Sequence, residues 1–242
     1  TAAVTALGEA LVAASDRPSV GVGVGTPGLV GPDGAVRAAH NLDWHRLPLR
    51  QLLADALGQA VEVANDANLA AIAEDRFGDG PEDLIRVQIS RGGGAGLLIG
   101  GAPLVGSSSA AGEIGHVVID PDGQPCRCGK AGCLETWVAA PALRRRIAAA
   151  EAERDAILAE AGRALGLALA PVVGLLDLTE VIVGGPADLI TGSFLEASQT
   201  IIHDRTRIDA RRPVVLRASA LGPDAVILGA AALVLRRRLG IH

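Results

Sequence analysis

The segment Ala111-Gly-Glu-Ile-Gly-His116, followed by Cys126-Arg-Cys-Gly-Lys-Ala-Gly-Cys-Leu-Glu135, carries the most specific pattern in this sequence. It places one imidazole and three thiols in a short stretch, which is the donor set of a closed tetrahedral zinc site. The four expected ligands are His116, Cys126, Cys128 and Cys133. Because protein would fill every position, no place remains for a catalytic water, and we expect the zinc to be structural. Three buried free cysteines beside an unrelated histidine are the alternative.

The loop around the cysteines supports the metal interpretation. Gly129 and Gly132 lie between the cysteines, where they let the backbone turn closely around an ion. All 3 cysteines of the chain lie in this loop, whereas a disulfide framework is usually even in number and spread along the chain. The cluster therefore predicts metal binding in a reducing, cytoplasmic environment.

Outside this loop, short apolar runs alternate with helical patterns. Strands that alternate with helices predict an α/β fold with helices on the faces of the sheet. A glycine-rich turn at 92–96 is expected to make a hairpin of the two strands that flank it. The expected strands are 20–24, 61–63, 84–89, 97–99, 180–183 and 214–218. The expected helices are an amphipathic 2–14, then 47–57, 66–77, 141–176 in two or three pieces, and 225–239.

The composition limits both the core and the partners. Hydrophobic residues make up 49% of the chain and aromatic residues only 2%, so the core must be built from Ala, Val, Leu and Ile. The net charge of -5 argues against this chain gripping nucleic acid by itself, since phosphate binding needs concentrated Lys and Arg. The arginine clusters at 144–146 and 236–238 are interpreted as solvated helix faces. No run of roughly 18 apolar residues occurs, so we expect no membrane span.

The metal segment resembles the signature of the ROK family (repressors, open reading frames and kinases). Further motifs follow in the order that the family shows: Gly23-Val-Gly-Thr-Pro-Gly28, Asn41-Leu-Asp-Trp44, Asn65-Asp-Ala-Asn68 and Gly184-Gly185. The resemblance covers nearly the whole chain and implies the actin-like, ribonuclease-H-like ATPase fold, two α/β lobes with a sugar between them. It implies one sugar-binding domain over residues 1–242, with a first lobe at about 1–75 and 225–242 and a second lobe at about 76–224.

A hexose presents hydroxyls that both donate and accept hydrogen bonds, which suits carboxylates, amides and imidazole. The resemblance implies sugar contacts by Asn65, Asp66, Glu113, His116 and Glu135, with Asn41 as a further candidate. Zinc would hold Glu113, His116 and Glu135 in one rigid patch. In kinases of the family, the aspartate at the place of Asp66 is the general base that takes the proton from the attacking sugar hydroxyl. Asn65 and Asp66 also fit a plain helix N-cap, and the two roles can coexist.

Two glycine-rich segments are weaker candidates for nucleotide contacts: Gly92, Gly93, Gly94 and Gly96 in the first, and Gly184 and Gly185 in the second. In the family's kinases the first segment cradles ATP phosphates with backbone N–H groups. Arg91 and Gly92 stand where those kinases tend to have Gly-Thr, and a plain hairpin turn is the alternative. Pro186 follows the second glycine pair, a form that resembles the regulators. The family's first phosphate motif, Asp-x-Gly-x-Thr, does not occur in this chain.

The resemblance favours the effector domain of a sugar-responsive transcriptional regulator. DNA would be bound by a winged-helix domain that precedes Thr1. The lead Asp120-Pro-Asp-Gly123 into the metal loop, the Gly184-Gly-Pro186 form and the altered turn at Arg91 support this hypothesis. The alternative is a glucokinase-type sugar kinase that uses ATP and Mg²⁺, with Asp66 as its base, and a scaffold that binds no sugar comes third. The family habit and the apolar helical stretch 156–176 also predict a homodimer or tetramer.

Overall fold

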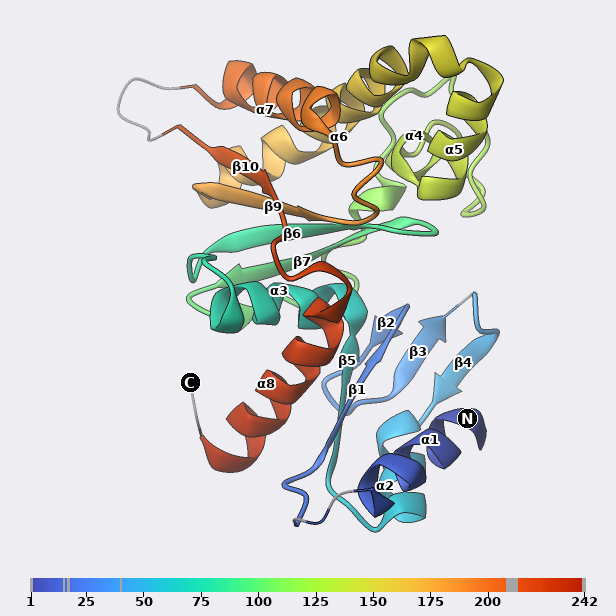
Figure 1. Cartoon of the computed structure of the whole chain (residues 1–242), viewed down its shortest axis with the longest axis vertical. Coiled ribbons are helices and arrows are strands. Elements are labelled where there is room, and N and C mark those ends of the chain that lie inside the picture. Colours follow the sequence, from blue (N-terminus) through green and yellow to red (C-terminus); the bar gives the residue numbers. More distant parts are fainter. Residues whose placement is uncertain (1, 15, 17, 40, 208–212, 241–242) are drawn as a thin grey trace.

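The computed structural model describes residues 2–14, 16, 18–39, 41–207 and 213–240, which form two α/β halves (Figure 1). The first half holds a parallel pair of strands, β1 and β5, and an antiparallel sheet of order β2-β3-β4. Its elements are α1 (Ala2–Ala13), β1 (Val22–Thr26), β2 (Leu29–Val30), β3 (Val36–Ala39), β4 (Trp44–Leu47), α2 (Leu49–Leu57) and β5 (Val61–Asn65).

The second half is built on a five-stranded sheet of order β10-β9-β6-β7-β8. The strands β10, β9 and β6 run parallel, whereas β7 and β8 continue the sheet in antiparallel steps. Its strands are β6 (Leu84–Ile89), β7 (Gly93–Ile99), β8 (Ala102–Pro103), β9 (Glu180–Gly184) and β10 (Val215–Ala218). Its helical elements are η1 (Ile114–His116), α4 (Leu134–Val138), α5 (Ala140–Ala149), η2 (Glu151–Glu153), α6 (Arg154–Leu176) and α7 (Gly192–Thr206).

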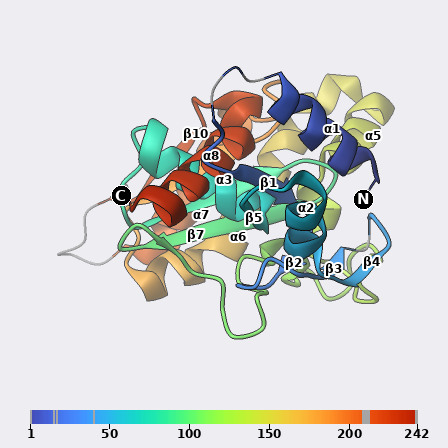
Figure 2. The same cartoon turned by 90° about the horizontal axis from the view of Figure 1, so that it is seen from below.

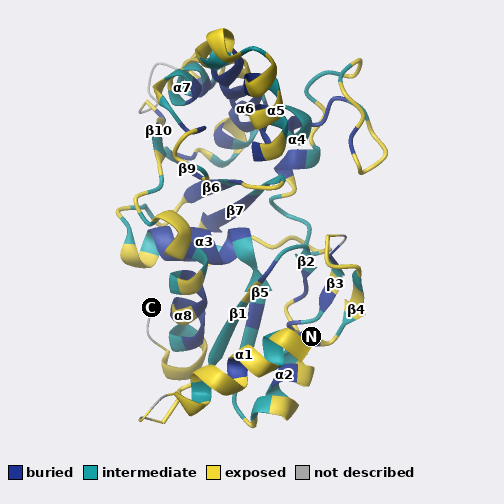
Figure 3. Ribbon diagram, turned by 45° about the vertical axis from the view of Figure 1, so that its right-hand side comes forward, coloured by how far each residue is buried: buried dark blue, intermediate teal, exposed yellow. Residues whose placement is uncertain are grey.

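Two helices stand between the halves, α3 (Asp66–Phe77) and α8 (Ala225–Leu239), which follows the short η3 (Gly222–Asp224). Figure 1 shows α3 directly beneath the five-stranded sheet and α8 below α3, beside β1 and β5, while α6 and α7 cover the other face of the sheet; Figure 2 views α3 and α8 from below. Both helices are buried along the side they share (Figure 3). They pack closely because small residues lie where they meet. A side chain on Gly229 of α8, for example, would overlap the carbonyl of Leu69 on α3. The core is aliphatic as predicted, with Phe194 its one fully buried aromatic side chain in the described chain.

Strand β6 separates two environments because side chains alternate across a sheet. Ile85, Val87 and Ile89 point into the larger core beneath α6 and α7. On the other face, Leu84 joins the core formed with α3 and α8. Arg86 follows Leu84 on that same face and is 1% exposed. A charged side chain is therefore buried at the boundary between the halves.

The expected strands and helices are present, with bounds within a few residues of those observed. The expected glycine turn at 92–96 is wrong in its place: the turn is at 90–92, and the glycines from Gly93 onward belong to β7. Helix α1 forms as expected but is not amphipathic, since Leu7 and Leu11 are exposed. Six further elements were not predicted, because short or polar elements leave weak periodic patterns: β2, β3, β4, β8, α4 and α7.

Helix α6 and the preceding turn form one segment, Glu151–Leu176, that is long and apolar enough to cross a membrane by those two measures alone. In the structure, 61% of its most apolar window is buried against the rest of the protein. It therefore has the character of a central core helix.

Candidate metal centre and sugar-binding face

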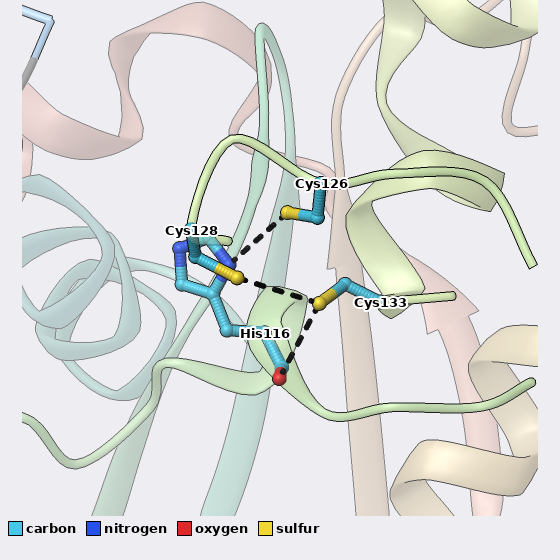
Figure 4. Close-up of side chains that lie close together, drawn as sticks. All are labelled: His116, Cys126, Cys128 and Cys133. Carbon is cyan, nitrogen blue, oxygen red and sulfur yellow. Dashed lines mark hydrogen bonds between the residues drawn. The ribbon is translucent and has the colours of Figure 1, made fainter. Parts of the chain in front are cut away.

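The segment from η1 to α4 brings the four predicted metal ligands together. The donor atoms of His116, Cys126, Cys128 and Cys133 all lie within 4.8 Å of one another (Figure 4). The Cys126 Sγ lies 3.8 Å from the His116 Nδ1, and the Cys128 Sγ lies 3.6 Å from the Cys133 Sγ. Ligand atoms about 2.0 to 2.3 Å from one tetrahedral ion are separated by roughly 3.5 to 3.8 Å. The cluster is therefore compatible with a structural zinc ion.

The backbone of the loop is shaped to present these side chains. The Cys126 N–H donates to the Lys130 carbonyl, and the Gly129 N–H returns to the Cys126 carbonyl, which closes a tight turn around the first two cysteines. Gly129 and Gly132 have φ of 90° and 64°, in the region that glycine adopts without strain. Both glycines therefore allow the tight turn beside the cysteines, and the ion that this turn would surround stays a prediction.

Three thiols this close together can ionise only if a cation compensates their charge. Burial, followed by the neighbouring thiols Cys128 and Cys126, raises the pKa of Cys133 to about 12. The Lys130 backbone N–H acts first among the groups that lower the pKa of Cys128. Clustered thiolates repel one another, so three of them cannot ionise together unless a positive ion compensates their charge.

The strap that carries Glu113 and His116 lies directly on strand β7. The Ala95 N–H donates to the Gly112 carbonyl over 2.8 Å. A side chain on Gly115 would overlap the carbonyl of Gly93, so only glycine permits this approach. The His116 Nε2 points toward Glu113, whose Oε2 is 3.9 Å away. One imidazole nitrogen thus faces the cysteines and the other faces a carboxylate, which is the usual arrangement around a metal-bound histidine.

Glu135 reaches the same area from the first turn of α4, two residues after Cys133. Its Oε2 lies against Gly92, close enough that a side chain on Gly92 would collide with it. The turn at 90–92 is anchored to the following helices by the Ala140 N–H, which donates to the Ser90 carbonyl. Glu135 therefore lies beside the glycine-rich turn, as a neighbour of the metal loop.

Asn65 and Asp66 begin helix α3. The Asn65 side chain caps this helix by accepting from the Ala67 and Asn68 N–H groups, and its amide nitrogen donates to the Gly28 carbonyl over 2.9 Å. The N-cap interpretation is therefore correct for Asn65. One carboxylate oxygen of Asp66 accepts from the Ala67 N–H over 2.8 Å. Burial raises the pKa of Asp66, against the opposing effects of backbone N–H groups and the charge of Arg86.

Asn41 lies apart from these groups, in the exposed turn between β3 and β4. Figure 1 shows this turn at the end of the small sheet that faces the second half. In the described part of the chain, no hydrogen bond joins Asn41 to the other predicted sugar-binding residues, so its role stays a prediction.

The glycines predicted to contact nucleotide all have close packing neighbours. Gly93 lies against Gly115, and Gly94 and Gly96 lie against Ala67 at the start of α3. A side chain on Gly184 would overlap the guanidinium of Arg86, and one on Gly185 would press on the carbonyl of Ile89. Packing thus explains Gly92, Gly96, Gly184 and Gly185 without a nucleotide, whereas Gly94 has room for a side chain, and the nucleotide assignment stays a prediction.

Sequence reasoning missed a buried polar group, the pair of Glu74 on α3 and Arg86 on β6. The signal was present in the strand Leu84-Ile-Arg-Val-Gln-Ile89, where Arg86 and Gln88 interrupt an apolar run on one face. A separate hollow of about 300 Å³ lies at the other end of α3. Its lining residues Asp75, Arg76, Glu82 and Arg236 are distinct from the predicted site.

Comparison with known proteins gives the setting of this site. The chain matches the ROK family over residues 2–237. It is 30% identical to a putative xylose repressor from Caldicellulosiruptor sp., over 95% of this chain and 66% of the repressor. The chain therefore spans about two thirds of that relative's length.

Solved structures of both functional classes are similar to it. One is a ROK family transcriptional regulator described as a homologue of E. coli MLC, with a TM-score of 0.82, 26% identity, and coverage of 98% of this chain and 67% of the regulator. Another is a ROK family glucokinase from Streptomyces griseus in complex with glucose and AMPPNP, with a TM-score of 0.81, 28% identity, and coverage of 96% and 88%. The ROK sugar-kinase-like, actin-like α/β fold is thus shown, and both repressors and kinases are among the relatives.

Proposed function

We propose, from the premise that this chain belongs to the ROK family, that it is the sugar-binding effector domain of a transcriptional regulator of carbohydrate metabolism. The observation that carries the proposal is that two carboxylates flank the metal cluster: Glu113 faces His116, and Glu135 follows Cys133 by two residues and lies against Gly92. The proposed setting is cytoplasmic, with the chain in a homodimer or tetramer and DNA bound by an N-terminal winged-helix domain.

The metal in this proposal is a structural Zn²⁺ held by His116, Cys126, Cys128 and Cys133. It supplies no chemistry beyond fixing the loop, because protein donors fill a tetrahedral set. The loop fixes in turn the strap on β7 and the first turn of α4, which carry Glu113 and Glu135. Their carboxylates are acceptors for sugar hydroxyls, and Asp66 and Asn65 supply further polar atoms from the start of α3.

Three features support a regulator over an enzyme. Arg91 and Gly92 stand in the glycine-rich turn where the kinases tend to have Gly-Thr, so the threonine hydroxyl is missing there, and the packing of Gly184 against Arg86 accounts for that glycine. The Gly184-Gly185-Pro186 form also resembles the family's regulators. A bound sugar would act by favouring one arrangement of the two lobes over another, which changes the DNA affinity of an attached domain.

The alternative function is an ATP-dependent glucokinase-type phosphotransferase, which the glucokinase complex with glucose and AMPPNP favours. In that case Asp66 accepts the proton from the sugar hydroxyl as that hydroxyl attacks the γ-phosphate. The raised pKa that burial gives Asp66 suits a proton acceptor.

The test is calorimetry of the zinc-loaded chain against a panel of hexoses, N-acylated hexoses and hexose phosphates, followed by an assay for sugar phosphorylation with ATP. We expect one class of sugar to bind and no phosphorylation. Sugar phosphorylation at a rate typical of kinases, abolished by Asp66→Asn, would transfer the assignment to the enzyme. Binding of no sugar by the zinc-loaded chain would overturn both forms of the proposal.

A further inference from the structure

A buried ionic cluster lies where the chain passes between the halves. Glu74 on α3 is 0% exposed and Arg86 on β6 is 1% exposed. The Arg86 Nε donates to the Glu74 Oε1 over 3.1 Å, and the Ser219 hydroxyl donates to the same oxygen. Removal of two charges from water is costly, so a pair buried this deeply must be held in a defined geometry.

The cluster joins the two places where the chain crosses from one half to the other. The first crossing runs from α3, which carries Glu74, into β6, which carries Arg86. The second runs from β10 into α8, and Ser219 is its first residue. The Ser219 N–H also donates to the Val183 carbonyl of β9 over 2.8 Å, which fixes it to the sheet. A single carboxylate oxygen therefore accepts from both crossings.

Neighbouring groups hold the guanidinium in place. The Arg86 Nη1 donates to the Gln88 Oε1 over 2.7 Å. Gly184, at the end of β9, leaves the space that the guanidinium occupies. The cluster thus fixes one point of α3 relative to strands β6 and β9.

This point lies on the helix that begins at the sugar site. Asp66 is eight residues before Glu74 on α3, about 12 Å along a rigid α-helix. The rest of the helix packs through apolar and small residues, with Leu69 and Ile72 in the core and Ala67 against Gly94 and Gly96. Hydrogen bonds to a buried carboxylate are directional, so Glu74 adds a defined orientation to this non-directional apolar contact.

We propose that Glu74 is a positioning residue for the sugar site. Its carboxylate joins both crossings and sets the angle at which Asn65 and Asp66 on α3 meet the carboxylates held by the metal loop on β7. Arg86 and Ser219 act through Glu74 and touch no sugar. The inference rests on the proposed sugar-binding function and adds to it the group that determines lobe geometry.

The test compares Ser219→Ala and Glu74→Gln with two matched controls elsewhere in the second half. Ser198→Ala removes a more deeply buried hydroxyl that donates to the Gly162 and Phe194 carbonyls within the α6–α7 layer. Glu180→Gln weakens the pair between Glu180 and Arg217 on neighbouring strands. Each variant is zinc-loaded and measured by thermal unfolding, by calorimetry with the sugar that binds wild type, and by small-angle scattering with and without that sugar.

We expect Ser219→Ala and Glu74→Gln to weaken sugar binding by about tenfold or more, the size of a lost hydrogen bond to a charged group. The double variant should bind no more weakly than Glu74→Gln alone, because both changes act through one oxygen. The two controls should lose thermal stability but keep the wild-type dissociation constant. Ser219→Ala and Glu74→Gln, the two crossing variants, should also change the small-angle scattering profile of the sugar-free protein. The two controls should leave this profile unaltered.

Dissociation constants within twofold of wild type for both crossing variants, with folding intact, would overturn the inference. Should Glu74→Gln fail to fold, Ser219→Ala decides, since it keeps the Glu74–Arg86 pair. If wild type binds no sugar, the proposed function fails, and the scattering comparison still decides on lobe geometry. An unchanged sugar-free profile in the crossing variants would then refute the role of Glu74 as well.

Discussion

The metal loop and the buried ionic cluster of Glu74, Arg86 and Ser219, which we call the lobe junction, are both polar, but the chain builds them differently. The metal loop takes its four donors from positions 116 to 133, and its geometry follows from a tight turn and two glycines. The lobe junction joins Glu74, Arg86 and Ser219, with Ser219 145 positions away from Glu74 in the chain. A local site can be recognised from its spacing, whereas a junction of distant residues exists only in the folded chain. The first carries Glu113 and Glu135, which we propose contact sugar, and the second is the proposed positioning group for helix α3.

The largest expected effect is on the metal loop. Cys128→Ser should abolish zinc binding and remove a stabilisation of the loop on the order of 10 kcal/mol. Cys128 is exposed, so its replacement creates no cavity and any loss must come from the metal. Elemental analysis and thermal unfolding measure both effects, and the adjacent exposed Arg127→Ser serves as the control. If Cys128→Ser keeps the wild-type zinc content and melting temperature, Cys128 is not a ligand of a stabilising metal, and the loop is held by protein contacts alone.

The second effect is on the junction. Arg86→Met should cost about 3 to 5 kcal/mol of unfolding free energy, because it leaves Glu74 buried without its charge partner. Glu74→Gln combined with Arg86→Met should recover part of that loss, since no unpaired charge remains. Arg217→Met is the control, because its partner pair is 29% and 18% exposed and should matter less. Denaturant unfolding decides, and an equal loss in both single arginine variants would contradict the special place of Arg86.

These two regions also explain what could be predicted. The α/β order, the bounds of α3, β6 and α8, and the grouping of the four metal ligands followed from periodicity, caps and spacing. The glycines of β7 were misplaced into a turn, because a glycine run is typical of turns unless packing demands small residues within a strand. Arg86 was passed over because sequence alone cannot show which charge has a buried partner.

The third effect sharpens the interpretation of Gly184. Gly184→Ala should cost about 1 to 3 kcal/mol without any nucleotide present, because its methyl group would overlap the Arg86 guanidinium. In an Arg86→Met background the same change should cost less, since methionine has no guanidinium for the new methyl group to overlap. Gly192→Ala at the start of α7 is the control, as its methyl group would meet only the flexible end of Glu196. If denaturant unfolding shows no loss of unfolding free energy in Gly184→Ala, packing does not explain this glycine, and nucleotide contact becomes the better explanation.

The smallest effect concerns Asp66, on the helix that carries Glu74 and at a position proposed to contact sugar. Burial raises its pKa above the ordinary value of 3.8, partly offset by backbone N–H groups and by Arg86. The folded state therefore holds the Asp66 proton more tightly than the unfolded state does. Its contribution to stability falls as pH rises from about 3.8 through the raised value and is constant above it. Asp66→Asn should accordingly stabilise the protein slightly at neutral pH.

Sugar binding should depend on pH in the opposite sense, because a sugar hydroxyl donates to the ionised carboxylate. The affinity should be constant at neutral pH and fall as pH drops through the raised pKa of Asp66, by at most about tenfold per pH unit. Asp66→Asn keeps the oxygen that caps Ala67 but carries no charge, so its weaker binding should be independent of this titration. Calorimetry of wild type and Asp66→Asn across the acidic range, with zinc content checked at each pH, separates the titration of Asp66 from loss of the metal. Unchanged pH dependence in Asp66→Asn would mean that the titrating group lies on the metal-loop side, and that the α3 side of the sugar site contributes shape without charge.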